Sequence, residues 1–231
     1  MYSLNNNTNV WDSVWKKDAY SKPELRSKKA TVKVEKLLDH IEINAVTTVL
    51  DLGCGGGYVA RELFSKTNAQ IYGIDSSEKA ISLAIELSKG TTIKFEKADV
   101  TKLPVPDSFA DVVLCIGVIE HVHDYEKCLD EIKRVLKTNG FIYVVSSNRD
   151  SFIYEQRIIR EKLGLWNYGY QKNWTKEELE NIFSKKGFST QFVETNSGIG
   201  NFRVIDKLDR FFSTSVKKRG RYIYYVGRIK K

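Results

Sequence analysis

The chain has 231 residues, of which 42% are hydrophobic, 29% charged and 12% aromatic. This length suits one domain with a single core, and the composition excludes a disordered or fibrous chain. The formal net charge is +8, and all of the excess lies in residues 202–231, which hold ten Lys and Arg against two acids. Such a segment can hold an anionic partner, namely phosphate, a lipid headgroup or RNA, or it can act only as a solubilising tail.

We expect neither a membrane-spanning helix nor an export signal in this sequence. The longest apolar run, residues 112–119, has eight residues, whereas a bilayer-spanning helix needs about 20. The first residues show no basic region followed by an apolar stretch, so no signal peptide is expected. The three cysteines form no CxxC pair, which disfavours a disulfide framework or a cysteine zinc site and predicts a cytoplasmic protein.

Strand and helix patterns alternate through the middle of the chain. Strands are predicted at residues 47–52, 71–74, 92–96, 110–116 and 141–146. Helices are predicted at residues 58–65, 77–88 and 126–136, the last stopped by the turn at Asn139 and Gly140. This alternation predicts an α/β protein with a parallel, doubly wound, Rossmann-like sheet that has helices on both faces.

The two ends of the chain extend this pattern. A helix is predicted at 28–40, and a basic amphipathic helix at 151–163. A capping box opens a further helix from 175 to about 185, and the final strands are predicted at 189–194 and 222–229. No long helix separates these two strands, so one strand should run antiparallel.

We therefore expect one domain over residues 1–231, in four parts. These parts are an N-terminal lid or helix (1–45), a cofactor-binding core (46–148), a helical insertion (149–186), and C-terminal strands with a basic tail (187–231).

The strongest motif is VLDLGCGGG at residues 49–57, a strand that runs into a glycine-rich turn and a helix. The NAD fingerprint fails, because Tyr58 stands at the sixth position counted from Gly53. Asp51, at the end of the strand, would repel a pyrophosphate but suits the ammonium group of an amino acid. Asp75, 22 residues after Gly53, ends the second strand, where an acid accepts ribose hydroxyls. Together these features favour S-adenosylmethionine as the ligand.

Five ordered segments between residues 49 and 148 resemble the class I S-adenosylmethionine-dependent methyltransferases. They read VLDLGCGGG, GIDSS, KADVTKLPVPDSFADVVLC, IEHV and LKTNGFIYVVSSN. The resemblance implies a seven-stranded sheet of order 3-2-1-4-5-7-6, with the last strand antiparallel, and helical lid additions. Within the family, CIGVIEHV is similar to the ubiquinone-biosynthesis O-methyltransferases.

The resemblance also implies cofactor contacts. Asp51, Gly53, Cys54 and Gly55 correspond to the methionine end, Asp75 and Ser76 to the ribose, Asp99 and Val100 to the adenine, and Ile116 to the neighbourhood of the sulfonium. Two simpler interpretations stay open: Asp51 can cap the loop, and Asp99 can cap the turn before Lys102.

His121 follows the strand that ends near the sulfonium, so it is our candidate general base. Alternatively, His121 packs against or bonds a helix end, with Glu120 as a cap. Some relatives hold a divalent metal with an ExxEH motif, but Gly117 stands where the first Glu would be, so no metal site is expected. The Asn-Pro-Pro motif of amino methyltransferases is missing as well.

Aromatic residues gather in the flanks and should build the acceptor pocket, unless they only pack added helices. Trp11 and Trp15 are spaced i and i+4, and Trp166, Tyr168, Tyr170 and Trp174 follow the amphipathic helix. Such residues favour a flat or apolar acceptor, or a lid that excludes water.

We therefore expect methyl transfer from S-adenosylmethionine to a small or lipid-like acceptor, at oxygen, by in-line displacement. The basic segments could contact an anionic membrane. One alternative is an RNA methyltransferase that uses the C-terminal basic cluster at residues 217–221. Another is a non-catalytic partner subunit that binds S-adenosylmethionine.

Overall fold

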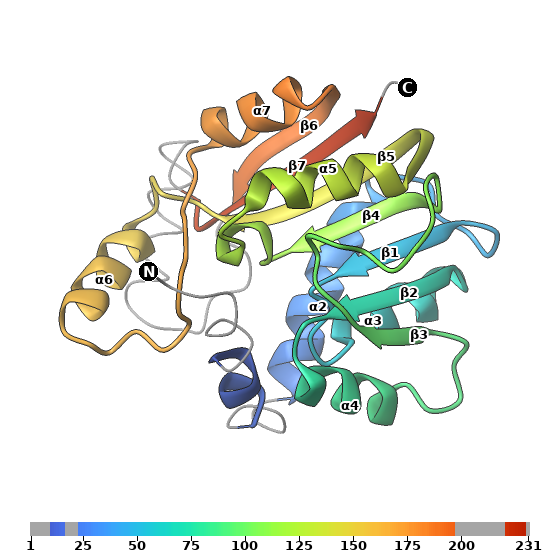
Figure 1. The fold of residues 1–231 in the computed structure, drawn as a ribbon, viewed down its shortest axis with the longest axis horizontal. Coiled ribbons are helices and arrows are strands. Elements are labelled where there is room, and N and C mark those ends of the chain that lie inside the picture. Colours follow the sequence, from blue (N-terminus) through green and yellow to red (C-terminus); the bar gives the residue numbers. More distant parts are fainter. Residues whose placement is uncertain (1–9, 17–22, 197–219, 230–231) are drawn as a thin grey trace.

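The computed structural model describes residues 10–16, 23–196 and 220–229 (Figure 1). Seven strands form one sheet in the order β3-β2-β1-β4-β5-β7-β6. The strands are β1 (Thr48–Leu52), β2 (Gln70–Asp75), β3 (Lys94–Lys97), β4 (Ala110–Ile116), β5 (Leu136–Ser147), β6 (Phe188–Asn196) and β7 (Tyr222–Ile229). β7 runs antiparallel to both of its neighbours, and the other pairs are parallel. The predicted fold class and strand order are confirmed.

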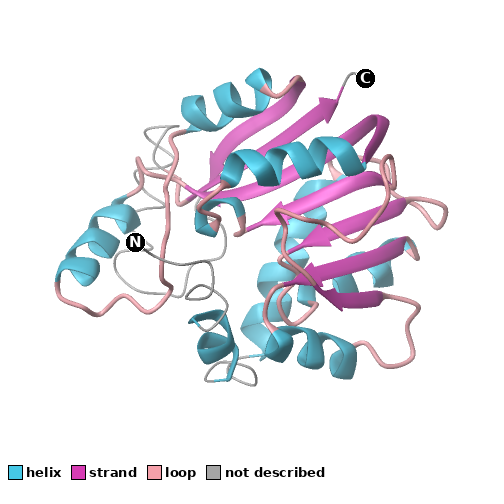
Figure 2. Cartoon of the chain, viewed as in Figure 1, coloured by secondary structure: helices cyan, strands magenta, loops and turns pink. Residues whose placement is uncertain are grey.

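Helices cover both faces of this sheet (Figure 2). They are α2 (Pro23–Leu38), α3 (Tyr58–Thr67), α4 (Glu78–Leu87), the short 3-10 helix η1 (Ile119–His121), α5 (Tyr125–Val135), α6 (Phe152–Lys162) and α7 (Lys176–Lys185). Residues 10–16 are also helical. The capping box predicted at the start of α7 is present, with Thr175 and Glu178 each bonding the other's backbone.

The sheet separates two apolar layers, because successive residues of a strand point to opposite faces. Val113 and Cys115 of β4 join one layer together with α5 and α7. Val112 and Leu114 join the other layer together with α2 and α3. All four side chains are almost completely buried, so β4 carries the continuous apolar run that a central parallel strand requires.

Three segments differ most from the sequence-based expectation. α2 begins at Pro23, five residues before its predicted start. β5 begins at Leu136, five residues early, and its register with β4 shifts between Ala110 and Val112. In α6, the side chain of Arg157 is buried while Ile159 and Leu163 are 58% and 65% exposed. An amphipathic helix would bury its apolar side chains and expose its cations. For these three residues the structure shows the opposite.

The parallel strands β1, β2, β4 and β5 all end at the same edge of the sheet, which is where open α/β sheets bind their ligands. Beyond this edge lie α6, on the left of Figure 1, and the helix of residues 10–16, at the bottom near the middle. No helix in the described part of the chain is long and apolar enough to cross a membrane. Most of the basic C-terminal cluster, residues 217–219, lies outside the described residues.

Candidate functional site

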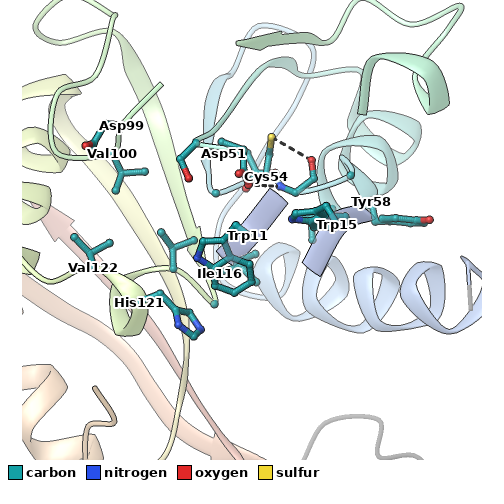
Figure 3. Close-up of a pocket in the computed structure, with 18 of the residues that line it drawn as sticks. Trp11, Trp15, Asp51, Cys54, Tyr58, Asp99, Val100, Ile116, His121 and Val122 are labelled. Carbon is teal, nitrogen blue, oxygen red and sulfur yellow. Dashed lines mark hydrogen bonds between the residues drawn. The ribbon is translucent and has the colours of Figure 1, made fainter. Parts of the chain in front are cut away.

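A cavity of about 440 Å³ lies at the carboxyl ends of β1, β2 and β4 (Figure 3). All ten residues proposed from the sequence line it: Asp51, Gly53, Cys54, Gly55, Asp75, Ser76, Asp99, Val100, Ile116 and His121. The fold therefore brings the whole predicted set together, although the role of each residue stays a prediction.

The glycine-rich loop forms one wall of this cavity. Gly53 and Gly55 have φ values of +60° and +54°, which side chains other than glycine rarely adopt. A Cβ atom on Gly53 would lie 2.4 Å from Cγ2 of Val118, and one on Gly55 would lie 2.4 Å from Cζ2 of Trp15. The loop can approach its neighbours and a ligand this closely only because it has no side chains there.

Asp75, at the end of β2, holds this loop in place. One of its oxygens, Oδ2, accepts a hydrogen bond from the backbone N–H of Gly55, and Oδ1 accepts one from Ser77, both at 2.9 Å. Burial raises the pKa of the Asp75 carboxyl, and the two backbone donors oppose that shift. Each carboxylate oxygen has a second lone pair, so Asp75 can still accept bonds from two ribose hydroxyls.

Asp51 is 2% exposed, and its Oδ2 atom has no hydrogen-bond partner among the described residues. Burial and the nearby Asp75 raise the pKa of Asp51 to about 7, while Lys33 acts in the opposite direction. A buried polar atom without a partner is costly and rare. Within the described residues, Oδ2 thus makes no hydrogen bond that would cap the loop, and it is open to a cationic donor.

Lys33 of α2 also lines the cavity, although it belongs to none of the motifs from which the site was predicted. Burial lowers the pKa of Lys33 to about 8, helped by Lys29 and opposed by Glu120 and Asp51. Arg26 and Lys29 line the same cavity. Their spacing of three and four residues puts these three cations on one helix face, which is a signal that the sequence already contained.

At the end of the cavity where adenine is expected, the structure is compatible with both interpretations of Asp99. Its Oδ1 atom accepts hydrogen bonds from the N–H and the hydroxyl of Thr101, each at 2.8 Å. Asp99 thus does cap the local turn, and it lines the cavity at the same time. Oδ2 would be the oxygen left for an adenine amino group.

Residues 10–16 lie against the cavity and bring two of the aromatic side chains to it. The Arg26 guanidinium lies 4.9 Å from the centre of the Trp15 ring, and Trp11 meets His121 edge-on at 4.8 Å. Asp12 anchors this helix by accepting a hydrogen bond from the hydroxyl of Ser77. In contrast, Trp174 is 3% exposed and belongs to the core, so the packing interpretation is correct for that residue.

His121 ends η1, and Nδ1 of its ring lies 2.8 Å from the backbone carbonyl oxygen of Tyr170. The preceding carboxylate, Glu120, is buried and accepts hydrogen bonds from Ser146 and from both the N–H and the hydroxyl of Ser147. His123 also lines the cavity, and its ring stacks on that of Tyr170 at 3.8 Å. Within the described residues, no three His, Cys, Asp or Glu side chains are grouped to hold a metal ion.

Comparisons with known proteins identify the family. The sequence profile of a family described as "Methyltransferase domain" matches residues 43–187. An uncharacterised protein of Methanocaldococcus jannaschii is 38% identical over 52% of this chain and 49% of its own length. The ubiquinone biosynthesis O-methyltransferase of Nitrosomonas europaea is 32% identical over 48% of each chain. The chain thus matches about half the length of these curated relatives.

Solved structures share the fold at lower sequence identity. A chain from the complex between the Haloferax volcanii Trm112 methyltransferase activator and a methyltransferase aligns with a TM-score of 0.76 at 18% identity, covering 96% of this chain and 98% of that one. A methyltransferase from Thermotoga maritima aligns with a TM-score of 0.72 at 20% identity, covering 96% and 99%. These likenesses bear on the fold alone.

The matched profile covers well over half of the chain, and the cavity lies where this fold binds its ligand. The chain belongs to the class I methyltransferases, whose cofactor is S-adenosylmethionine.

Proposed function

We propose that this chain is an enzyme that transfers a methyl group from S-adenosylmethionine to an oxygen atom of a small or lipid-like acceptor. The observation that carries the proposal is one cavity that combines the glycine loop, His121 and a carboxylate oxygen of Asp51 that has no hydrogen-bond partner among the described residues. The likeness to ubiquinone biosynthesis O-methyltransferases supports oxygen as the target.

The cavity residues fit this cofactor in charge and in shape. Asp51 would hold the methionine ammonium, Lys33 would hold its carboxylate, and Asp75 would accept the ribose hydroxyls. Gly53, packed closely against Val118, would present its backbone to the methionine end. Cys54, Gly55, Ser76, Val100 and Ile116 would complete the walls, and Asp99 would take the adenine.

When bound, the cofactor supplies an electrophilic methyl group, which an acceptor oxygen takes by in-line displacement. His121 would accept the proton that the acceptor hydroxyl loses. Trp11, which contacts both His121 and Tyr168, would orient a flat acceptor and exclude water. We assign cofactor binding to 46–148 together with Lys33 of α2, and acceptor binding to the rest of 1–45 and to 149–186.

A lipid-like acceptor is supported by an exposed apolar surface on α6 and the segment after it, whose Tyr168 contacts Trp11 of the cavity wall. Ile159, Leu163, Leu165 and Tyr168 are between 39% and 65% exposed, beside the exposed cations Arg160 and Lys162. Apolar side chains with a basic fringe suit the interface of an anionic membrane. Binding to vesicles that contain anionic lipid, lost in Leu163→Ser, would test this.

The three cysteines are free, which supports a reducing cytoplasm.

A partner-dependent protein is the second candidate. The chain solved together with the Trm112 activator matches almost the whole of this chain, which supports a subunit that works only with a partner. An RNA methyltransferase that uses residues 217–221 is the remaining alternative, although most of that cluster lies outside the described residues.

One experiment separates these functions. The protein is incubated with methyl-labelled S-adenosylmethionine and a cell extract, and RNA, lipid and small-molecule fractions are counted. Label in the lipid or small-molecule fraction, reduced in His121→Ala, supports the proposal, and label in RNA overturns it. Cofactor binding without label, followed by labelling when a candidate activator is added, favours the partner-dependent protein.

A further inference from the structure

Residues 164–174, which we call the strap, connect α6 to α7 and run between α6 and the sheet (Figure 1). Two hydrogen bonds join the strap to η1. The carbonyl oxygen of Tyr170 lies 2.8 Å from Nδ1 of His121, and the N–H of Lys172 donates to the carbonyl oxygen of Glu120 at 2.7 Å. The strap therefore touches the candidate base directly.

The bond to Tyr170 determines where the His121 ring carries its proton. A carbonyl oxygen can only accept a hydrogen bond, so Nδ1 must be the donor. In the neutral ring the lone pair then lies on Nε2, and this is the nitrogen that can take a proton. A single backbone carbonyl thus selects one of the two tautomers of His121.

A buried side chain of α6 holds the strap at this position. Arg157 is 8% exposed and donates through Nη2 to the carbonyl oxygen of Gln171 at 2.7 Å. Its Nη1 donates to the side-chain oxygen of Asn173. The guanidinium also lies 5.3 Å from the centre of the Trp166 ring. Arg157 therefore donates hydrogen bonds to the strap one and three residues after Tyr170. Its guanidinium also contacts the strap four residues before Tyr170, at Trp166.

This arrangement requires arginine in particular. The planar guanidinium presents several donors in a fixed fork, whereas a lysine presents one compact charge on a flexible stem. The remaining hydrogen-bond partner of Arg157 among the described residues is Glu161, which is exposed and lies 3.3 Å away on the same helix. Arg157 thus makes its two shorter hydrogen bonds to residues of the strap.

We propose that Arg157 is a positioning residue for the methyltransferase site. Through Gln171 and Asn173 it keeps the Tyr170 carbonyl on Nδ1 of His121, and so keeps this ring in the Nδ1–H form with Nε2 as the basic nitrogen. The use of Nε2 as a base rests on the proposed function, whereas the control of the tautomer does not.

The test is nitrogen NMR of the protein labelled with ¹⁵N-histidine. The chain has only three histidines, and variants of His40 and His123 assign the signals. In the wild-type protein at high pH, the His121 ring should be protonated at Nδ1. Arg157→Ala and, less severely, Arg157→Lys should give a mixture of both tautomers, while Glu161→Gln should keep the wild-type signal.

Activity provides the second readout. Arg157→Ala should leave the dissociation constant for S-adenosylmethionine unchanged, because Arg157 does not line the cavity. Its kcat should fall by up to about 100-fold, the loss expected when a catalytic group is misplaced. If Arg157→Ala does not fold, Asn173→Ala removes one acceptor of the fork and should shift the tautomer in the same direction.

Protonation of the wild-type His121 at Nε2 would overturn the inference, and so would a pure Nδ1–H signal in folded Arg157→Ala or, if that variant does not fold, in Asn173→Ala. The NMR readout needs no acceptor. A tautomer change with no methyl transfer in the wild-type protein would therefore reject the proposed function and leave the control of His121 by Arg157 standing.

Discussion

Lys33 and Asp51 lie on the wall of the same cavity and carry opposite charges, although α2 and β1 separate them by 18 positions in the chain. Each shifts the pKa of the other toward the charged form, but burial outweighs this attraction for both groups. As a result Asp51 titrates at about 7 and Lys33 at about 8, so both groups change charge within the physiological pH range.

Cofactor binding should therefore follow a bell-shaped pH dependence. The methionine ammonium favours ionised Asp51, so affinity falls, and binding releases a proton, as the pH drops below about 7. The methionine carboxylate favours protonated Lys33, so affinity falls, and binding takes up a proton, as the pH rises above about 8. Each limb should approach about tenfold per pH unit.

Isothermal titration calorimetry in buffers of different ionisation enthalpy measures both the affinity and the protons exchanged. Asp51→Asn should remove the acidic limb alone, and Lys33→Met should remove the alkaline limb alone. A flat profile between pH 6 and 9 in the wild-type protein would show that these two residues do not hold the methionine end.

Gly53 offers a test of shape rather than charge. Gly53→Ala should weaken cofactor binding, because its Cβ would lie 2.4 Å from Cγ2 of Val118 and displace the loop. Gly90→Ala is the matched control, since Gly90 also has a positive φ but has no atom within 4 Å of the added Cβ. Both variants should lose about 1–2 kcal/mol of stability from left-handed strain.

Only Gly53→Ala should show a higher dissociation constant for S-adenosylmethionine. Equal affinities for the two variants in calorimetry, once both are shown to be folded, would contradict the assignment of the glycine loop to the cofactor.

The parts of the fold that depend on local patterns could be predicted from the sequence. The last strand has its predicted bounds, Tyr222–Ile229, because a run rich in tyrosine, isoleucine and valine that follows Gly220 is a local signal. The ten proposed site residues also share one cavity, since strands that are parallel end at the same edge of the sheet.

Contacts between distant segments could not be predicted in this way. Tyr170 lies 49 positions after His121, and only the folded strap brings its carbonyl to the ring. The sequence places Arg157 in a predicted basic amphipathic helix, where a cation is expected to face solvent. In the structure, its side chain is buried against the strap. In both cases tertiary hydrogen bonds override the local pattern.

Phe183 tests the packing beneath the C-terminal strands. It is fully buried, stacks on Tyr225 at 4.7 Å and meets Phe188 edge-on at 5.5 Å. Phe183→Ala should lower the free energy of unfolding by about 3–5 kcal/mol, a large share of the usual total. Urea denaturation measures this loss. Ile85→Ala, at a 52% exposed position, should change it by less than about 1 kcal/mol, and equal losses would contradict the described core.

His121 decides whether this site uses a general base. Once an acceptor is known, His121→Ala should lower kcat by about 100-fold to 10,000-fold, since a positioned base contributes that much to a proton transfer. His40→Asn should keep the wild-type rate, because His40 stacks on Phe192 outside the cavity. Cofactor affinity should be unchanged in both variants. If His121→Ala methylates its acceptor at the wild-type rate, the acceptor loses its proton without help, and catalysis rests on holding the oxygen in line with the methyl group.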